Sequence, residues 1–135
     1  MLAIYSLVAY GAGVLESTCG LYKGNVTIDG KDIPLLFDTG SNSLWINEKP
    51  CSSTEGSWDI KYDIGEVSGT YCASAQTASI GGCAVSVPQL ATATSVSGVT
   101  DCTRGTLGLG MPGATAEAGQ PFLKSLNVHT GCDNK

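Results

Sequence analysis

The sequence has little of what a metal centre or a nucleic-acid interface requires. His129 is the only histidine, and no two cysteines have the Cys-x-x-Cys spacing, so the usual zinc-ligand patterns are missing. Lysine and arginine together number 7 against 12 acidic residues, which gives a net charge of -5. An acidic surface argues against nucleic-acid binding, because phosphates require a basic face. We therefore expect no metal site, no nucleic-acid partner and no cofactor.

A long apolar run is missing as well. Residues 1–15 carry no charge, but about 20 apolar residues are needed to cross a bilayer, so no membrane span is expected. This stretch resembles the hydrophobic part of a secretory signal without its basic start, and it also contains good strand formers. Residues 1–20 are therefore expected to form an N-terminal arm or a first strand, ahead of a single domain at 21–135.

A phosphate-binding loop is missing too. The glycines of the segment at 105–110 have no Lys-Ser or Lys-Thr after them, which a nucleotide-phosphate loop requires. Near the chain's end, His129 has no nucleophile partner in the sequence and is expected to be a surface residue.

Small and β-branched residues between 18 glycines are what the chain has in abundance, and they favour an all-β fold. Residues 21–28 and 33–37 are expected to be strands joined by a turn at 29–32, because Asp-Gly favours a tight hairpin. A loop at 47–57 precedes a long hairpin made by 58–62 and 67–80. Further strand material follows at 83–99. Pro121 and helical spacing of apolar residues predict one short helix at 121–126.

The six cysteines are even in number and widely spaced, which favours disulfides in an oxidising compartment over buried free thiols. They allow 15 connectivities, among which the sequence does not choose. They are Cys19, Cys51, Cys72, Cys83, Cys102 and Cys132. Asn25-Val26-Thr27 is formally an N-glycosylation site, although its place inside a predicted strand disfavours its use.

The most informative stretch is an apolar run at 35–37 that leads into Asp38, Thr39, Gly40 and Ser41. A strand end beside a core desolvates a carboxylate, which is costly unless the charge has a function or a partner. Thr and Gly suit a tight loop whose N–H groups and hydroxyl hold that carboxylate. The tripeptide alone is equally consistent with an ordinary turn.

The flanking residues distinguish these interpretations. The segment at 35–46, with Leu44-Trp45 after the Asp-Thr-Gly-Ser motif, resembles the active-site signature of the N-terminal lobe of pepsin-like aspartic proteases. The similarity extends over about residues 21–127, through the preceding hairpin and the later Gly-Leu segment at 105–110. It implies one lobe of the pepsin-like acid protease fold, with packed antiparallel sheets, a flap hairpin and one short helix.

The resemblance also implies site residues. Asp38 would be the catalytic carboxylate, supported by Thr39, Gly40 and Ser41. In this family a hairpin called the flap closes over the substrate, and its tyrosine hydrogen-bonds toward the active-site tryptophan. Here Tyr62 and Gly65 would belong to the flap and Trp45 would be the tyrosine's partner. Without the Asp-Thr-Gly motif, the same hairpin would be an ordinary edge hairpin.

Such enzymes activate water between two aspartates, and no second Asp-Thr-Gly or Asp-Ser-Gly follows in this sequence. The expected function is thus an aspartic endopeptidase lobe that cleaves peptide or protein substrates. It would need a second copy, as a homodimer, or a separate C-terminal lobe. The expected location is secreted, extracellular or vacuolar, in an oxidising or acidic compartment.

Two departures from the family pattern support an alternative. Asp63 follows Tyr62 where the family usually has Gly, and Arg104 precedes Gly105 where the family usually has Asp. An added carboxylate near the flap tip affects the charge balance around Asp38, and a buried Arg would require a partner, so Arg104 is expected to be exposed or paired. The alternative is an inactive fragment or relative that binds peptide in the groove under the flap.

Overall fold

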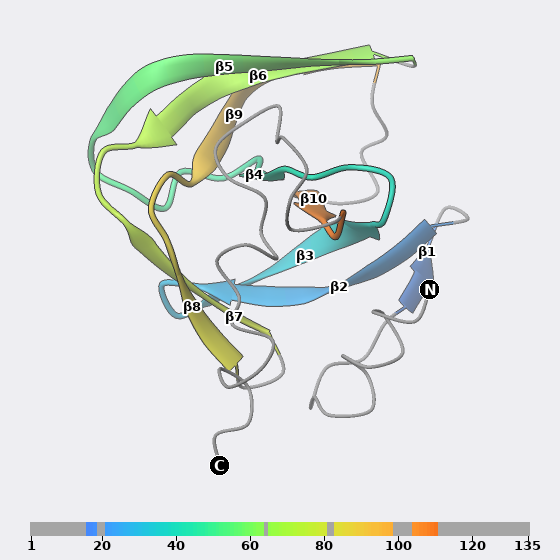
Figure 1. The fold of residues 1–135 in the computed structure, drawn as a ribbon, viewed down its shortest axis with the longest axis horizontal. Coiled ribbons are helices and arrows are strands. Elements are labelled where there is room, and N and C mark those ends of the chain that lie inside the picture. The colour runs from blue at the N-terminus through green and yellow to red at the C-terminus, as the bar shows by residue number, and fades with distance from the viewer. Residues whose placement is uncertain (1–15, 19–20, 64, 81–82, 99–103, 111–135) are drawn as a thin grey trace.

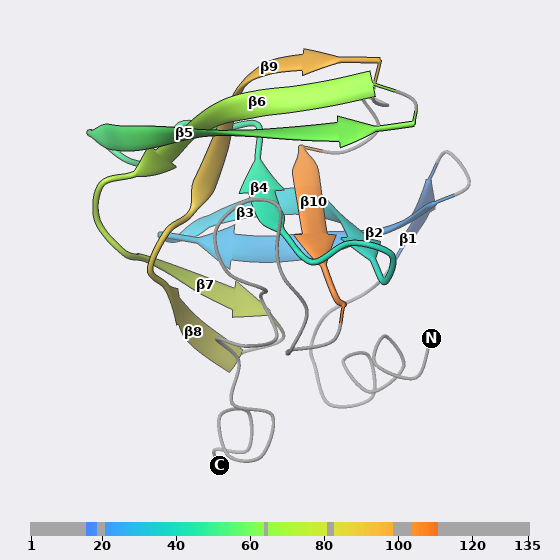
Figure 2. The same cartoon turned by 45° about the horizontal axis from the view of Figure 1, so that its top comes forward.

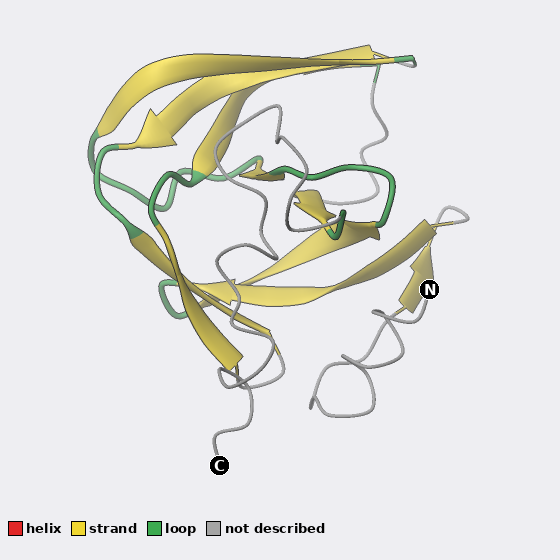
Figure 3. Ribbon diagram, in the orientation of Figure 1, coloured by secondary structure: helices red, strands yellow, loops and turns green. Residues whose placement is uncertain are grey.

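The computed structural model describes residues 16–18, 21–63, 65–80, 83–98 and 104–110. These residues form strands, turns and loops without a helix (Figure 3), which confirms the all-β expectation for this part of the chain. The predicted helix at 121–126 and the segment at 1–15 lie outside the described residues. The strands are β1 (Glu16–Thr18), β2 (Leu21–Ile28), β3 (Lys31–Asp38), β4 (Leu44–Ile46), β5 (Thr54–Tyr62), β6 (Gly65–Cys72), β7 (Gln76–Ile80), β8 (Cys83–Val87), β9 (Ala91–Ser97) and β10 (Gly105–Gly108).

The β2–β3 hairpin forms as the Asp-Gly pair predicts. Asp29 and Gly30 both have positive φ, at 49° and 82°, the backbone of a two-residue turn whose twist matches the flanking strands. The turn is shorter than the predicted one at 29–32, because Lys31 and Asp32 already pair with β2. Alternate residues of both strands are buried, so one face of the hairpin packs into the core.

The later strands differ from the prediction at their ends. The expected loop at 47–57 is shorter, because β5 begins at Thr54 and continues through a bulge between Glu55 and Trp58. Gly56 within this bulge has a φ of 66°, which glycine adopts without strain. The expected run at 67–80 is two strands, β6 and β7, and that at 83–99 is also two, β8 and β9.

The described strands join into one hydrogen-bonded path with the order β5-β6-β9-β4-β10-β3-β2-β7-β8, and β1 pairs with β2 beside it. Most neighbours are antiparallel, but β10 runs parallel to β3 and β4 runs parallel to β9. In place of the expected packed antiparallel sheets, the strands form a single sheet with both parallel and antiparallel neighbours. Figures 1 and 2 show it folded over, with β5, β6 and β9 on one side, β2, β7 and β8 on the other, and β10 between β4 and β3.

Two apolar clusters fill this fold. The larger one draws on β2, β3, β4, β7 and β10 and includes the fully buried Val26, Leu35, Ile46 and Leu107. The smaller one surrounds Trp45 under β5, β6 and β9. Burial of side chains of this size contributes about 1.5–3 kcal/mol each. Since β4 contributes to both clusters, it links the two parts of the core beside the Asp38 loop.

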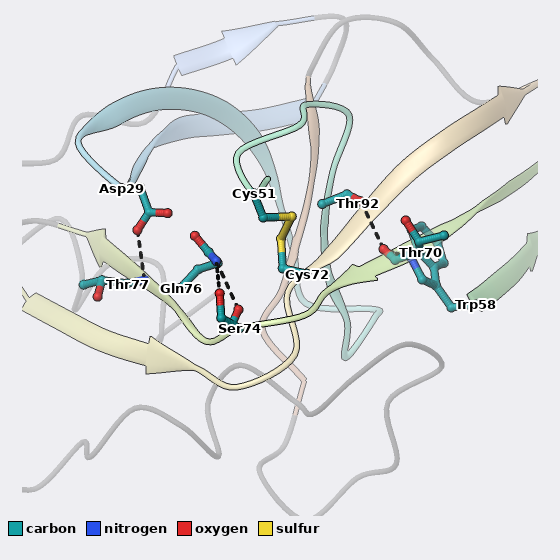
Figure 4. Close-up of a disulfide and its surroundings, with 9 residues drawn as sticks. All are labelled: Asp29, Cys51, Trp58, Thr70, Cys72, Ser74, Gln76, Thr77 and Thr92. Carbon is teal, nitrogen blue, oxygen red and sulfur yellow. Dashed lines mark hydrogen bonds between the residues drawn. A yellow bond between two sulfur atoms is a disulfide. The ribbon is translucent and has the colours of Figure 1, made fainter. Parts of the chain in front are cut away.

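A disulfide between Cys51 and Cys72 ties the loop after β4 to the end of β6 (Figure 4). The Cα atoms are 5.7 Å apart and 21 positions separate the two residues. Closing a loop of this length in the unfolded chain stabilises the fold by about 3 kcal/mol in the chain-entropy estimate. The bond confirms the expectation of disulfides for this pair. Cys19, Cys102 and Cys132 lie outside the described residues.

Candidate active site

Asp38 is the last residue of β3, at the point where the strand leaves the core. Its side chain is half-buried, and the backbone N–H of Gly40 donates a 2.9 Å hydrogen bond to Asp38 Oδ1. A backbone N–H fixed in this way holds the carboxylate in one orientation. The carboxylate therefore lies at the edge of the apolar core while remaining partly open to solvent. Thr39 and Gly40, which follow it, are exposed.

The loop after Asp38 is braced by the segment that contains β10. Leu109 N–H donates to the Asp38 carbonyl at 2.8 Å, and Gly110 N–H donates to the Ser41 carbonyl at 3.0 Å. Gly108 N–H donates to the Ser43 carbonyl at 2.9 Å. Three backbone bonds thus fix the Asp38 loop against the segment at 104–110.

Gly108 is required for this close approach. A Cβ atom at this position would lie 2.6 Å from the backbone nitrogen of Ser43 and 2.7 Å from the carbonyl oxygen of Ser41. Both neighbours are backbone atoms, so neither can rotate away as a side chain does. Only glycine permits β10 to run this close to the loop that carries Asp38.

Ser41 is buried in this loop, with 7% of its surface exposed. Its hydroxyl oxygen has no hydrogen-bond partner among the described residues. A buried hydroxyl without a partner costs about 1–3 kcal/mol. Ser41 lies in the loop after Asp38, and its role in supporting the carboxylate stays a prediction.

The structure brings Trp45 and Tyr62 together, as predicted. Trp45 Nε1–H donates a 3.0 Å hydrogen bond to the Tyr62 hydroxyl oxygen. Trp45 belongs to β4 and is buried, whereas Tyr62 ends β5 and is half-buried. This bond connects the β5–β6 hairpin to the strand that follows the Asp38 loop.

Trp58 strengthens the same connection, and our sequence interpretation gave it no role. Its ring lies 6.2 Å from that of Trp45, centroid to centroid, and its Nε1–H donates to the Thr70 carbonyl at 3.0 Å (Figure 4). Alternation along β5 places Trp58, Ile60 and Tyr62 on one face. That alternation was the signal from which the whole aromatic contact could have been anticipated.

The tip of the β5–β6 hairpin is short. Tyr62 pairs directly with Gly65, and Asp63 between them is exposed. A Cβ atom on Gly65 would lie 1.9 Å from the Ser97 carbonyl oxygen, so this glycine permits close packing against the end of β9. Of the expected flap residues, Tyr62 thus contacts Trp45 and Gly65 packs on β9.

Arg104 is exposed and paired, as expected. Its guanidinium donates to Glu48 at 2.8 Å, and Lys31 Nζ lies 3.0 Å from the other oxygen of the same carboxylate. Glu48 is mostly covered, with 19% of its side chain exposed, while both cations are largely exposed. Sequence reasoning missed this role of Glu48, because nothing in a polar loop marks one acid as a partner for two distant cations.

The described ranges contain no group of three or more His, Cys, Asp or Glu side chains arranged to hold a metal ion. Among the same residues, no helix is long and apolar enough to cross a membrane. The described residues bring together one oriented carboxylate, a buried hydroxyl and a hairpin held by a tryptophan–tyrosine hydrogen bond.

Comparison with known proteins gives a partial similarity. No protein-family model matches the chain. An aspartic protease from Phaffia rhodozyma is 35% identical to it over 63 residues, which make up 45% of this chain and 16% of that protein. The matched segment is thus a small part of the relative's length. Over fewer than half of its residues, the chain is similar to an aspartic protease.

Proposed function

We propose that residues 21–135 form one lobe of an aspartic endopeptidase, with residues 1–20 as an arm of which β1 is part. The observation that carries this proposal is the oriented Asp38 carboxylate, which accepts from Gly40 N–H, on a backbone whose carbonyl accepts from Leu109 N–H. The similarity to an aspartic protease over 63 residues supports it. The substrate would be a peptide or an unfolded protein, bound between Asp38 and the β5–β6 hairpin as the flap.

The reaction requires a second carboxylate beside Asp38. Two close carboxylates share one proton, because both cannot remain charged at short range. The charged carboxylate takes a proton from water, and the water oxygen bonds to the scissile carbonyl carbon. The protonated carboxylate gives its proton to the carbonyl oxygen. Collapse of this tetrahedral intermediate breaks the C–N bond, and the amine leaves with a proton.

Within this reaction the chain's own residues orient one carboxylate and cover the substrate. Gly40 N–H and the backbone bonds to β10 restrict the motion of Asp38, so less freedom is lost as the transition state forms. Tyr62, held by Trp45, would position the flap over the substrate and exclude water. The second aspartate would come from a second copy of the chain or from a separate C-terminal lobe.

A first prediction concerns Asp38 itself. Asp38→Asn keeps the shape of the side chain but removes the charge, so cleavage of an unfolded protein between about pH 2 and 6 should fall to background. Inhibition of the wild-type chain by a statine-type transition-state analogue should accompany activity. The matched control is Asp59→Asn, the same substitution at an exposed β5 position, which should retain full cleavage. Residual activity in Asp38→Asn would show that this residue is not the acid or base.

A second candidate function is peptide binding without cleavage. The exposed Asp63 at the hairpin tip favours it, because a carboxylate at this place changes the charge of the groove in which Asp38 would work. Calorimetric titration with the statine-type analogue separates the two functions. If the chain binds the analogue but cleaves no substrate, either alone or with a partner lobe, the result would favour the peptide-binding function.

A further inference from the structure

Asn25 belongs to a motif that the proposed peptidase function does not use. It lies in the middle of β2, opposite Pro34 on β3. Its neighbours along the strand, Gly24 and Val26, are buried, whereas Asn25 itself is exposed. Since successive side chains of a strand point to opposite faces, Asn25 points away from the core.

This exposure removes the objection that a strand position disfavours a glycan. An N-linked glycan needs an Asn-x-Ser or Asn-x-Thr segment and an asparagine that the folded protein leaves on its surface. Asn25 and Thr27, being two positions apart, lie on the same outer face of β2. On β2, the pairing with β1 ends at Lys23 and the pairing with β7 begins at Thr27. Neither β1 nor β7 therefore pairs with Asn25.

The site also lies away from the proposed chemistry. Pro34, the partner of Asn25, precedes Asp38 by four positions on β3, which corresponds to about 13 Å along a strand. By the same alternation, Pro34 and Asp38 share the outer face of the hairpin with Asn25, so distance along the strand separates a sugar at Asn25 from the Asp38 loop. The two sites are therefore compatible in one molecule.

We propose that Asn25 is an N-glycan acceptor in the secretory pathway. In the transfer, the Asn25 side-chain nitrogen bonds to C1 of the first sugar of a polyprenyl-diphosphate oligosaccharide. The bond between C1 and the diphosphate breaks, the polyprenyl diphosphate leaves with the electron pair, and one amide proton is lost. The Cys51–Cys72 disulfide indicates an oxidising compartment, independently of any peptidase activity.

The hydroxyl of the motif has a partner in the folded chain. Thr27 Oγ1 donates a 2.6 Å hydrogen bond to Asp32 Oδ1, so the hydroxyl that completes the motif is occupied once β3 pairs with β2. We expect the transfer to be more efficient before β3 pairs with β2, because after pairing the bond to Asp32 competes for this hydroxyl.

The test uses the full chain expressed behind a secretion leader in yeast, with both secreted and cell-associated protein collected. Removal of N-glycans by an amidase in H₂¹⁸O, followed by trypsin, releases the peptide from Gly24 to Lys31. We expect this peptide to contain ¹⁸O-labelled Asp at position 25. Recovery of the peptide only with unmodified Asn25, from both fractions, would overturn the proposal.

Matched variants distinguish this site from any other cause of a mass shift. Asn25→Gln and Thr27→Ala should lose the glycan, whereas Thr27→Ser should keep it. Asn47→Gln removes an exposed asparagine outside the motif and should leave the glycan in place. Folded, disulfide-bonded chain incubated with a microsomal transferase and its lipid donor should be modified less than unfolded chain; equal modification of the two would contradict the expected competition.

Discussion

At the scale of single residues, the Trp45–Tyr62 hydrogen bond is the contact that most directly links the hairpin to the loop of Asp38. Trp45 is buried, and its Nε1–H donates to the Tyr62 hydroxyl oxygen. Removing the acceptor leaves that donor with an unmet hydrogen bond, and the cost of such a group is about 1–3 kcal/mol. The bond thus contributes both to stability and to the position of the hairpin.

Tyr62→Phe tests this directly. It should lower the free energy of unfolding by about 1–3 kcal/mol, because Trp45 Nε1–H loses its partner. It should also lower kcat/KM of the active assembly, because the hairpin is less well held over the substrate. Urea unfolding and cleavage assays measure the two effects. Tyr22→Phe, at a tyrosine that is 49% exposed, serves as the control; an equal loss there would argue against a specific role for the bond.

At the scale of elements, the passage of β10 against the Asp38 loop is the feature that sets the site. Gly108→Ala should force the Ser41–Ser43 backbone outward, since the added methyl would lie 2.6 Å from a backbone nitrogen. Overpacking of this kind costs about 1–3 kcal/mol. The loss of kcat/KM should be larger than the fraction of unfolded chain explains, because the displaced loop carries Asp38.

The comparison variant for this prediction is Gly30→Ala, at the β2–β3 turn. Nothing lies within 4 Å of an added Cβ there, but its φ of +82° strains any other residue, at about 1–2 kcal/mol. The two variants should lose similar stability. If Gly30→Ala loses as much activity as Gly108→Ala, well below both melting temperatures, general destabilisation explains the loss and the bracing role is wrong.

The elements that the sequence predicted well are those whose signals are local. Asp29-Gly30 specifies a tight turn through its own backbone preferences, and burial alternates along β2 and β3 as a half-buried hairpin requires. By contrast, the interruptions after Cys72 and after Val87 were missed. The second interruption begins at Pro88, a local strand breaker that our interpretation did not use. The first, at residues 73–75, contains neither Gly nor Pro, so no strong local signal marks it.

The candidate active site also contains features that could be anticipated and features that depend on the tertiary structure. The Asp38 loop and the Trp45–Tyr62 pair were anticipated, but through the resemblance to a family and not through periodicity. The double pairing of Glu48 with Lys31 and Arg104 was missed. It joins three segments that lie far apart in the sequence, and its formation depends on the sheet order. No local pattern contains that information.

At the scale of the whole molecule, the question is what completes the site. With a net charge of -5 at pH 7 and a sequence pI near 4.5, two copies repel one another at neutral pH. Protonation of carboxylates removes this repulsion as the pH falls toward the pI. If the partner is a second copy, association measured by sedimentation should be strongest near the pI and weaker at pH 7. A chain that stays monomeric throughout would leave a separate lobe as the partner.

Mixing provides a sharper test of the homodimer. When wild-type chain and Asp38→Asn are combined in equal amounts and allowed to exchange, about a quarter of the dimers contain two wild-type copies. If each active site needs both Asp38 side chains, activity per total chain should fall to about a quarter of the wild-type value. A fall to about half would mean that each chain acts without the other's aspartate.

The central position of β10 has a consequence for folding during synthesis. In the described sheet, β10 is the link between β4 and β3, and it is the last described strand to leave the ribosome. Until residue 108 has emerged, the path consists of two half-sheets, each with an inner edge of unpaired backbone groups open to wrong partners. Asp38 is fixed by Leu109 only at that late stage. A nascent chain is therefore most vulnerable to aggregation just before its proposed active site takes shape.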